Sequence, residues 1–296
     1  MGTLIKQALI VQPRWFAAPV LVSSVVLGYV VSAPLSWFVF VPILFALCVM
    51  AWGHTMNTVL DYSWTGLDKG LESERSHPKP YTSGQQVIAS GMLTARQVFL
   101  IAVGWLAVST IAMIYISIHA ASLWVFVFWA LSALVTFAYS WGKLHWLCEI
   151  ALGVGFGPLA ALIGAAASPS PDYLASALAS IPIFLIFGWG AEAYDQWFDS
   201  DTNWDQGLRN IGAWVWHTKN SIGLAVGVIV LATFLAQGLL VLSGILSLWT
   251  LLSLPAALSL VLLPQAEKRK PWAVNLLLGA VFYYCIALAV GQVVGG

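Results

Sequence analysis

Long apolar stretches alternate with short polar connections along almost the whole chain. They fall at nine places, near residues 16–32, 36–56, 98–118, 122–140, 150–167, 173–191, 220–241, 244–263 and 272–293. Each stretch approaches the roughly 20 residues that an apolar helix needs to cross the hydrocarbon core of a bilayer. The pattern therefore predicts an all-α integral membrane protein with nine transmembrane helices, in which residues 1–296 form a single domain.

Small and helix-breaking residues interrupt the fifth and sixth stretches. The interruptions are Gly153, Gly155, Gly157, Pro158 and Pro182. Such residues are tolerated within a membrane where neighbouring helices or a cavity satisfy the backbone. We therefore expect both stretches to span the membrane with local irregularities.

Composition and charge extend this picture. The chain is 60% hydrophobic and only 8% charged, which excludes an ordinary soluble domain. The connections near 33–35, 119–121, 168–172 and 242–243 contain no Lys or Arg, so all twelve basic residues fall on the other side. By the positive-inside rule we expect that side to be cytoplasmic, and the N-terminus to lie on it. The two long polar connections, about 57–97 and 192–219, lie there too. The chain has no basic tail for nucleic acid.

Two aspartate clusters begin these long connections: Asp61 and Asp68 in the first, and Asp195, Asp199, Asp201 and Asp205 in the second. They are six of the twelve acidic residues. Carboxylates beside membrane helices are costly and usually functional. Asn57 and Asp61 are four residues apart, and Glu192, Asp195 and Asp199 have the spacing i, i+3, i+7, so each set shares one helix face. Oxygen ligands of this kind suit Mg²⁺, which often binds together with substrate phosphates. The candidate metal ligands are Asn57, Asp61, Asp68, Glu192, Asp195, Asp199, Asp201 and Asp205. The alternative is that some of these acids are solvated loop caps.

Basic and phenolic residues on the same side complete a candidate diphosphate site. Tyr139 and Lys143 form a Y-x-x-x-K step, which places both side chains on one helix face. Further candidates for binding phosphate are Arg75, Lys79, Arg209 and Lys219. For any one of these residues the alternative is ordinary positive-inside topology.

Aromatic side chains near these motifs suit an allylic carbocation, which aromatic faces stabilise and a dry cavity protects from water. They are Trp52, Tyr62, Trp64, Tyr139, Trp141, Trp189, Tyr194 and Trp197. Interface anchoring or core packing would explain many of them equally well. His54, on the span that carries the first cluster, fits core packing as well as a site.

At these residues the chain resembles the UbiA superfamily of intramembrane prenyltransferases. NTVLDYSWTGLD (57–68) is similar to the family's first Asp-rich motif, in the form found in the 1,4-dihydroxy-2-naphthoate prenyltransferase branch. The other similar segments, in family order, are GQQVIASGMLTARQV (84–98), YSWGK (139–143), CEIALGVGFGPLAALIGA (148–165) and YDQWFDSDTNWDQGLRNI (194–211). The resemblance implies nine helices around a central cavity and an Mg²⁺-dependent reaction of a prenyl diphosphate within the bilayer.

The chain also departs from the family pattern. The first motif has one extra residue between Asp61 and Asp68, and the second can be read with either Asp195/Asp199 or Asp201/Asp205 as its metal pair. Gln12 and Gln86 stand where relatives often have Arg. The loss of these two cations weakens the case for a carboxylated aromatic acceptor.

The leading hypothesis is a prenyltransferase that ionises a polyprenyl diphosphate and passes the prenyl group to an aromatic or other lipid-soluble acceptor. Asp61, Asp68, Asp195, Asp199 and Tyr139 are its predicted catalytic residues. The first alternative is a UbiA-type terpene cyclase, in which the cation closes on its own double bonds without an acceptor. A second is a transporter that uses buried acids for cation passage, which would place acids across the membrane depth.

Overall fold

The computed structural model describes residues 2–67, 87–198, 204–205, 207–266 and 271–295. Helices and turns make up these ranges, and none of their residues is in a strand. The first half contains α1 (Gly2–Lys6), η1 (Gln7–Val11), η2 (Trp15–Ala17), α2 (Ala18–Ser32), η3 (Trp37–Val39), α3 (Phe40–Ser63), α4 (Ala95–His119) and α5 (Trp124–Gly142).

The second half begins with two spans that are each built from several helical segments. It contains α6 (Cys148–Val154), η4 (Gly155–Leu159), α7 (Ala160–Ala166), α8 (Tyr173–Ala179), α9 (Ile181–Ile183), η5 (Phe184–Ala191), α10 (Glu192–Phe198), α12 (Ile211–His217), α13 (Ile222–Leu242), η6 (Leu248–Ser253), α14 (Leu254–Ala266) and α15 (Pro271–Gly295).

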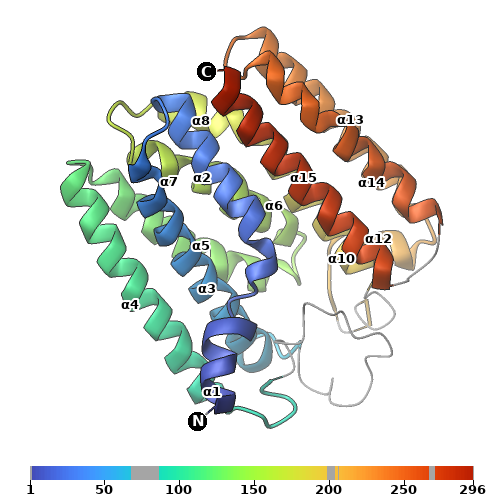
Figure 1. Cartoon of the computed structure of the whole chain (residues 1–296). Coiled ribbons are helices and arrows are strands. Elements are labelled where there is room, and N and C mark those ends of the chain that lie inside the picture. Colours follow the sequence, from blue (N-terminus) through green and yellow to red (C-terminus); the bar gives the residue numbers. More distant parts are fainter. Residues whose placement is uncertain (1, 68–86, 199–203, 206, 267–270, 296) are drawn as a thin grey trace.

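Eight helices of the described chain are long and apolar enough to cross a membrane, so the chain is an integral membrane protein. They are Leu4–Ser32, Trp37–Ser63, Ala95–His119, Trp124–Gly142, Cys148–Ala166, Tyr173–Trp197, Ile222–Leu242 and Leu276–Gly295. The predicted stretch 244–263 is the shorter apolar helix Leu248–Val261, whose first six residues form the 3₁₀ helix η6. Each predicted stretch therefore has an apolar helix. The chain begins at α1 and ends with α15 on opposite sides of the bundle, as an odd number of passes requires (Figure 1).

The two interrupted stretches are continuous spans with π-helical segments. Pro158 lies inside η4, and the eight residues of η5 are also π-helical. Proline has no N–H for the regular ladder, and a wider turn relieves the clash of its ring with the preceding turn. Single π-turns are rare and are found often at functional sites. The predicted irregularity is therefore real, and it does not break either span.

Glycine lets two helices of the core touch through their backbones. A Cβ atom on Gly28 of α2 would overlap the carbonyl oxygen of Ala161 in α7, and one on Gly164 of α7 would overlap the carbonyl oxygen of Val25. Lipid supplies no hydrophobic driving force between helices, so close van der Waals packing at small residues stabilises such crossings. The close contact of α2 with α7 fixes the two helices that flank the central cavity.

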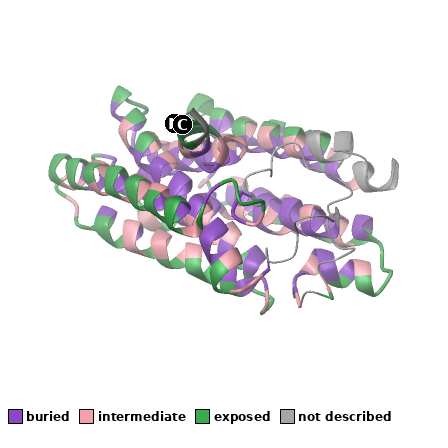
Figure 2. Cartoon of the chain, turned by 90° about the horizontal axis from the view of Figure 1, so that it is seen from below, coloured by how far each residue is buried: buried purple, intermediate pink, exposed green. Residues whose placement is uncertain are grey.

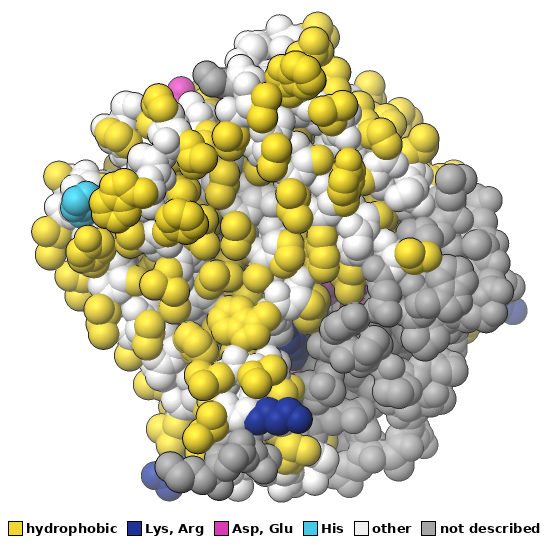
Figure 3. Space-filling model, viewed as in Figure 1, with side chains coloured by type: hydrophobic (Ala, Val, Ile, Leu, Met, Phe, Trp, Pro, Cys, Tyr) yellow, Lys and Arg dark blue, Asp and Glu magenta, His cyan; other side chains and the backbone are white. Residues whose placement is uncertain are grey.

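The remaining surface is suited to lipid. Buried residues gather on the inward faces of the helices and exposed ones on the outward faces (Figure 2). The outer face of α13 carries a row of exposed leucines and a valine, among them Leu224, Val228, Leu231 and Leu235. Hydrophobic side chains cover most of the face seen in Figure 3. Such a surface is unstable in water and stable in a bilayer.

We expect Gly28→Ala to lower the free energy of unfolding by about 1–3 kcal/mol, because the added methyl group forces α2 away from α7. Gly104→Ala is the matched control, since a Cβ atom on Gly104 of α4 meets open space. Thermal unfolding in detergent measures both. Equal melting temperatures for the two variants would contradict the close backbone contact.

Candidate functional site

A buried polar cluster joins the end of α3 to the end of α5. Lys143 Nζ lies 2.6 Å from Asp61 Oδ2 and 3.4 Å from Asn57 Oδ1. Asn57 Nδ2 donates to Asp61 Oδ2 at 2.9 Å, and Ser140 Oγ donates to Asn57 Oδ1 at 2.9 Å. The i, i+4 spacing in α3 predicted that Asn57 and Asp61 share a face, and they do. The pairing with Lys143 comes from the fold alone.

This cluster is almost fully removed from solvent. Asp61 is 2% exposed and Lys143 is 5% exposed. Taking both charges out of water costs several kcal/mol for each ion, and their attraction offsets this only when the remaining polar atoms are satisfied. One atom is not: Asp61 Oδ1 is buried and has no hydrogen-bond partner. A carboxylate oxygen left open in this way can receive a cation or a hydrogen-bond donor of a ligand.

A second polar group lies on α10. Glu192 Oε1 accepts hydrogen bonds from Tyr139 Oη at 3.0 Å and from Gln196 Nε2 at 2.9 Å. The ring of Tyr139 lies under Lys143 Nζ, with 4.7 Å from the nitrogen to the ring centroid. Tyr139 therefore connects the carboxylate of α10 to the lysine that pairs with Asp61. Asp195, one turn further along α10, is partly buried.

Arg14 is a functional candidate that the sequence analysis missed. It is 7% exposed, its Nη2 donates to Thr58 Oγ1 at a long 3.4 Å, and its buried Nε has no partner. Its backbone is left-handed, with φ 53°. Thr58 follows Asn57 on α3, so the guanidinium contacts α3 at the level of the polar cluster. No anionic group of the described residues pairs with it, and a buried cation of this kind is unfavourable unless an anion binds beside it.

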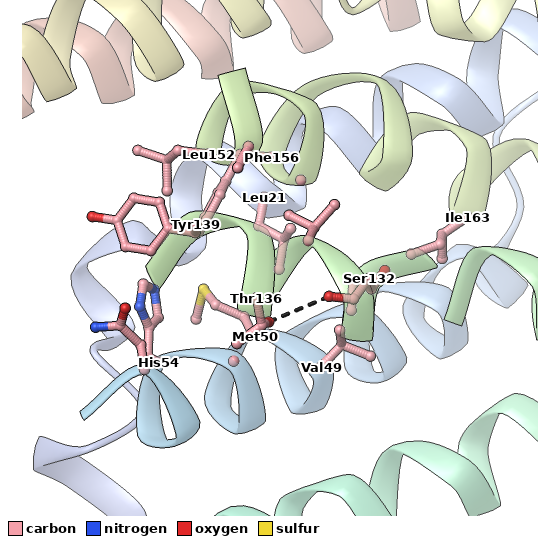
Figure 4. Close-up of a pocket in the computed structure, with 16 residues that line it drawn as sticks. Leu21, Val49, Met50, His54, Ser132, Thr136, Tyr139, Leu152, Phe156 and Ile163 are labelled. Atoms are coloured by element: carbon pink, nitrogen blue, oxygen red, sulfur yellow. Dashed lines mark hydrogen bonds between the residues drawn. The ribbon is translucent and has the colours of Figure 1, made fainter. Parts of the chain in front are cut away.

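The polar cluster opens onto an apolar cavity of about 90 Å³ between α2, α3, α5, α6 and η4. Its lining residues are Leu21, Ala46, Val49, Met50, Gly53, His54, Asn57, Ser132, Val135, Thr136, Tyr139, Ala151, Leu152, Gly155, Phe156 and Ile163. The rings of Tyr139, Phe156 and His54 approach one end of the cavity (Figure 4). Among the aromatic residues singled out from the sequence, Tyr139 lines this cavity. Phe156, which the sequence analysis did not consider, also lines it.

Other predicted site residues lie apart from this cluster. Arg209 turns back to its own loop, where Nη1 donates to the carbonyl oxygens of Leu208 and Trp204 and the guanidinium covers the Trp204 ring. Lys219 and Asp205 are exposed. The predicted residues Asp68, Arg75, Lys79, Asp199 and Asp201 fall outside the described ranges, as does Gln86. Their roles stay predictions.

The remaining position of interest, Gln12, is buried. Its Nε2 donates to Gln7 Oε1 at 3.1 Å, one turn earlier in the chain. Gln12 and Arg14 both belong to the irregular segment between η1 and η2. The amide at position 12 is therefore part of the packing of this segment, and the nearby charge is supplied by Arg14.

The oxygen ligands of the described residues are of the kind that suits a magnesium ion, but they do not form a complete ligand set. Asn57, Asp61, Glu192 and Asp195 supply hard oxygen atoms, and Asp61 Oδ1 is open. Within the described ranges, no three His, Cys, Asp or Glu side chains are grouped closely enough to hold a metal ion. A full site would need a residue from the segments that follow α3 and α10, where Asp68 and Asp199 are predicted to contribute.

The fold has known counterparts, although no protein-family model matches the chain and no curated protein matches it in sequence. A UbiA homologue from Aeropyrum pernix K1 in its apo form has a TM-score of 0.66 at 17% identity, over 96% of this chain and 98% of that one. A structure of digeranylgeranylglyceryl phosphate synthase has a TM-score of 0.63 at 14% identity, over 99% of both chains.

A third counterpart carries ligands. A UbiA homologue from Archaeoglobus fulgidus bound to DMAPP and Mg²⁺ has a TM-score of 0.55 at 15% identity, over 96% of this chain and 99% of that one. At these identities the likeness shows the fold alone. The chain therefore has the UbiA fold, which confirms the resemblance drawn from its motifs.

We expect Asp61→Asn and Lys143→Met each to lower the free energy of unfolding by about 3–5 kcal/mol, because each leaves one charge buried without its partner. The double variant should lose much less than the sum. Unfolding in detergent, measured for all four proteins, gives the coupling energy. Strictly additive losses would show that the two side chains do not interact as described.

Proposed function

We propose that this protein is a UbiA-type intramembrane prenyltransferase that ionises a prenyl diphosphate and transfers the prenyl group to a hydrophobic or aromatic acceptor. The observation that carries the proposal is Arg14, a buried guanidinium with no anionic partner among the described residues. It contacts Thr58 of α3, the sequence neighbour of Asn57, which lines the apolar cavity. A diphosphate would supply the missing anion. An apolar chain attached to it would fill the cavity.

The comparison structures support the same ligand class. One UbiA homologue binds DMAPP and Mg²⁺, and another structure is that of a digeranylgeranylglyceryl phosphate synthase. If this chain binds its substrate in a related way, the diphosphate lies between α3 and α10, where Lys143 and Arg14 contribute positive charge. Tyr139 and its partner Glu192 border the same space.

Asn57, Asp61, Glu192 and Asp195, with the predicted Asp68 and Asp199, are the residues that would hold Mg²⁺. When bound, the ion would act as a Lewis acid on the diphosphate leaving group. Among the two alternative metal pairs of the second motif, Asp195 with Asp199 is preferred. Asp195 follows Glu192 on α10, which faces the cluster, whereas Asp205 is exposed in a turn.

The reaction then needs only heterolysis and capture. The bond between C1 and the diphosphate oxygen breaks, and its electron pair leaves with the diphosphate. The faces of Tyr139 and Phe156 stabilise the allylic cation, and the apolar lining excludes water. The acceptor forms the new bond to C1, and its proton passes to a carboxylate or to the released diphosphate.

The orientation in the membrane belongs to this proposal. The described basic residues lie near the ends of the spans or between them, on the side that the span pattern predicts to be one face: Lys6, Arg14, Arg96, Lys143, Arg209 and Lys219. By the positive-inside rule this side is cytoplasmic. The water-soluble diphosphate would then enter from the cytoplasm, and the acceptor from the bilayer.

We expect Asp61→Asn and Asp195→Asn to lower Mg²⁺-dependent release of diphosphate by at least about 100-fold, because each replaces a charged carboxylate ligand with a neutral amide and weakens binding of the ion that stabilises the leaving group. The measurement is diphosphate release and product analysis with purified protein, Mg²⁺ and a prenyl diphosphate, with and without acceptors. Asp172→Asn is the matched control, since this acid caps α8 on the far side and asparagine caps equally well.

The double variant Asp61→Asn/Lys143→Met separates chemistry from folding, because it removes both charges together and should fold while remaining inactive. Full activity in both aspartate variants would refute the assigned metal ligands. A cyclic hydrocarbon or terpene alcohol formed from prenyl diphosphate alone would identify the protein as a terpene cyclase.

We expect Arg14→Gln to weaken binding of a prenyl diphosphate by about 10- to 100-fold, because a hydrogen bond to a charged group contributes about 1.5–3 kcal/mol. The same change should not lower the melting temperature of the free protein, since it removes an unpaired buried charge. Thermal shift with an unreactive prenyl thiolodiphosphate measures both effects. Arg96→Gln, at an exposed position of α4, is the control. Unchanged ligand stabilisation in Arg14→Gln would exclude Arg14 from the diphosphate site.

A further inference from the structure

His54 is the polar residue of the cavity whose hydrogen-bonding capacity is left unused. It lies on α3 and lines the cavity, and its Nε2 is buried without a hydrogen-bond partner. Its ring points into the space beside Tyr139 and Met50 (Figure 4). A buried ring nitrogen left in this state is unfavourable unless a ligand satisfies it.

The other polar groups of the cavity wall already have partners. Thr136 Oγ1 donates to the carbonyl oxygen of Ser132, and Ser132 Oγ donates to that of Phe128. Tyr139 Oη donates to Glu192, and Asn57 belongs to the cluster with Asp61 and Lys143. His54 is therefore the group of this wall, among the described residues, that is available to recognise a ligand by a hydrogen bond.

Aromatic neighbours hold the imidazole in place. The Phe16 ring lies 6.5 Å from it and the Phe156 ring 6.0 Å, measured between centroids. These contacts are apolar, so they fix the direction of the ring without satisfying Nε2. Packing therefore holds the imidazole in one orientation before a ligand binds.

The position of His54 along α3 coincides with the place of the reaction. His54 precedes Asn57 by three residues, which corresponds to about 4.5 Å along the helix axis. If the diphosphate is bound at Asn57 and Asp61, the first carbon atoms of the prenyl chain lie at the level of His54. The acceptor must approach the prenyl C1 at this same depth.

We propose that His54 determines acceptor specificity, and that its Nε2 forms a hydrogen bond with a hydroxyl group of the acceptor. This inference rests on the proposed prenyltransferase function. The prenyl chain is a hydrocarbon and has no group for the imidazole, and the diphosphate binds one helical turn away. A hydroxyl group fits either tautomer of the ring, because it both donates and accepts.

The test compares hydroxyl probes with a methyl ether, which cannot donate. The probes are 1,4-dihydroxybenzene and 1-dodecanol, beside 1,4-dimethoxybenzene, which has no hydroxyl group but can still be prenylated at a ring carbon atom with loss of its proton. The products are measured with Mg²⁺ and a prenyl diphosphate. We expect the wild type to prenylate a hydroxyl probe and to leave the ether unchanged. His54→Phe, which retains an aromatic ring, should raise the KM for that probe by about 10- to 100-fold. The KM for the prenyl diphosphate should stay the same.

Two further variants make the result specific. His54→Gln should keep most of the acceptor affinity, because its amide reaches a similar point and forms the same hydrogen bond. Thr110→Val removes a hydroxyl of α4 that donates to the carbonyl oxygen of Leu106 and lies outside the cavity lining, and it should behave as the wild type. Melting temperatures and binding of the prenyl diphosphate, measured for every variant, show whether each protein is folded.

The outcomes separate this inference from the proposed function. No release of diphosphate by the wild type with any prenyl diphosphate would refute the proposed function itself. If the wild type does turn over, an unchanged acceptor KM in His54→Phe would overturn the inference alone. Equal prenylation of the hydroxyl probes and the ether by the wild type, or prenylation of neither, would overturn it without relying on a variant.

Discussion

The buried ion pair between Asp61 and Lys143 is the interaction on which the polar end of the bundle depends. It joins α3 to α5 across 82 residues of sequence, at 2.6 Å, in a place where both side chains are almost inaccessible. Two such charges are stable away from water only together and with hydrogen bonds around them. Asn57 and Ser140 supply part of these hydrogen bonds. The pair therefore fixes how α3 and α5 meet.

The same point organises the loop that follows α10. The backbone N–H of Arg209 donates to the carbonyl oxygen of Lys143 at 2.7 Å, and the N–H of Trp146 donates to that of Arg209 at 3.0 Å. Glu149 accepts a hydrogen bond from the N–H of Ile211, at the first turn of α12. Movement of Lys143 would thus disturb both the acid of α3 and the loop beside α10. Charge, helix packing and loop position are coupled through one residue.

The sequence was sufficient to predict elements whose causes are local. Apolar length predicted the positions of the spans, and the spacings of Asn57/Asp61 and Tyr139/Lys143 placed each pair on one helix face. Contacts between distant segments could not be predicted from the sequence. No pattern in it indicates that Lys143 pairs with Asp61, or that Tyr139 donates to Glu192. Arg14 was missed because a basic residue before the first span has the ordinary explanation of membrane topology. Its burial follows from the left-handed turn after Pro13, which only the fold reveals.

The side chains on one face of α3 change in polarity along the cavity. Ala46, Met50, His54 and Asn57 all line the cavity, and Asp61 continues the same face at spacings of three and four residues. Their chemistry changes from apolar through an imidazole ring to an amide and a carboxylate, over about 22 Å of helix. A prenyl diphosphate has the same gradient along its length, so only one direction of binding matches both ends. In the proposed complex, His54 lies at the boundary between the hydrocarbon and the leaving group. The hydrocarbon offers the imidazole no hydrogen-bonding group, and the diphosphate binds one helical turn away. This argues that a second molecule reacts there.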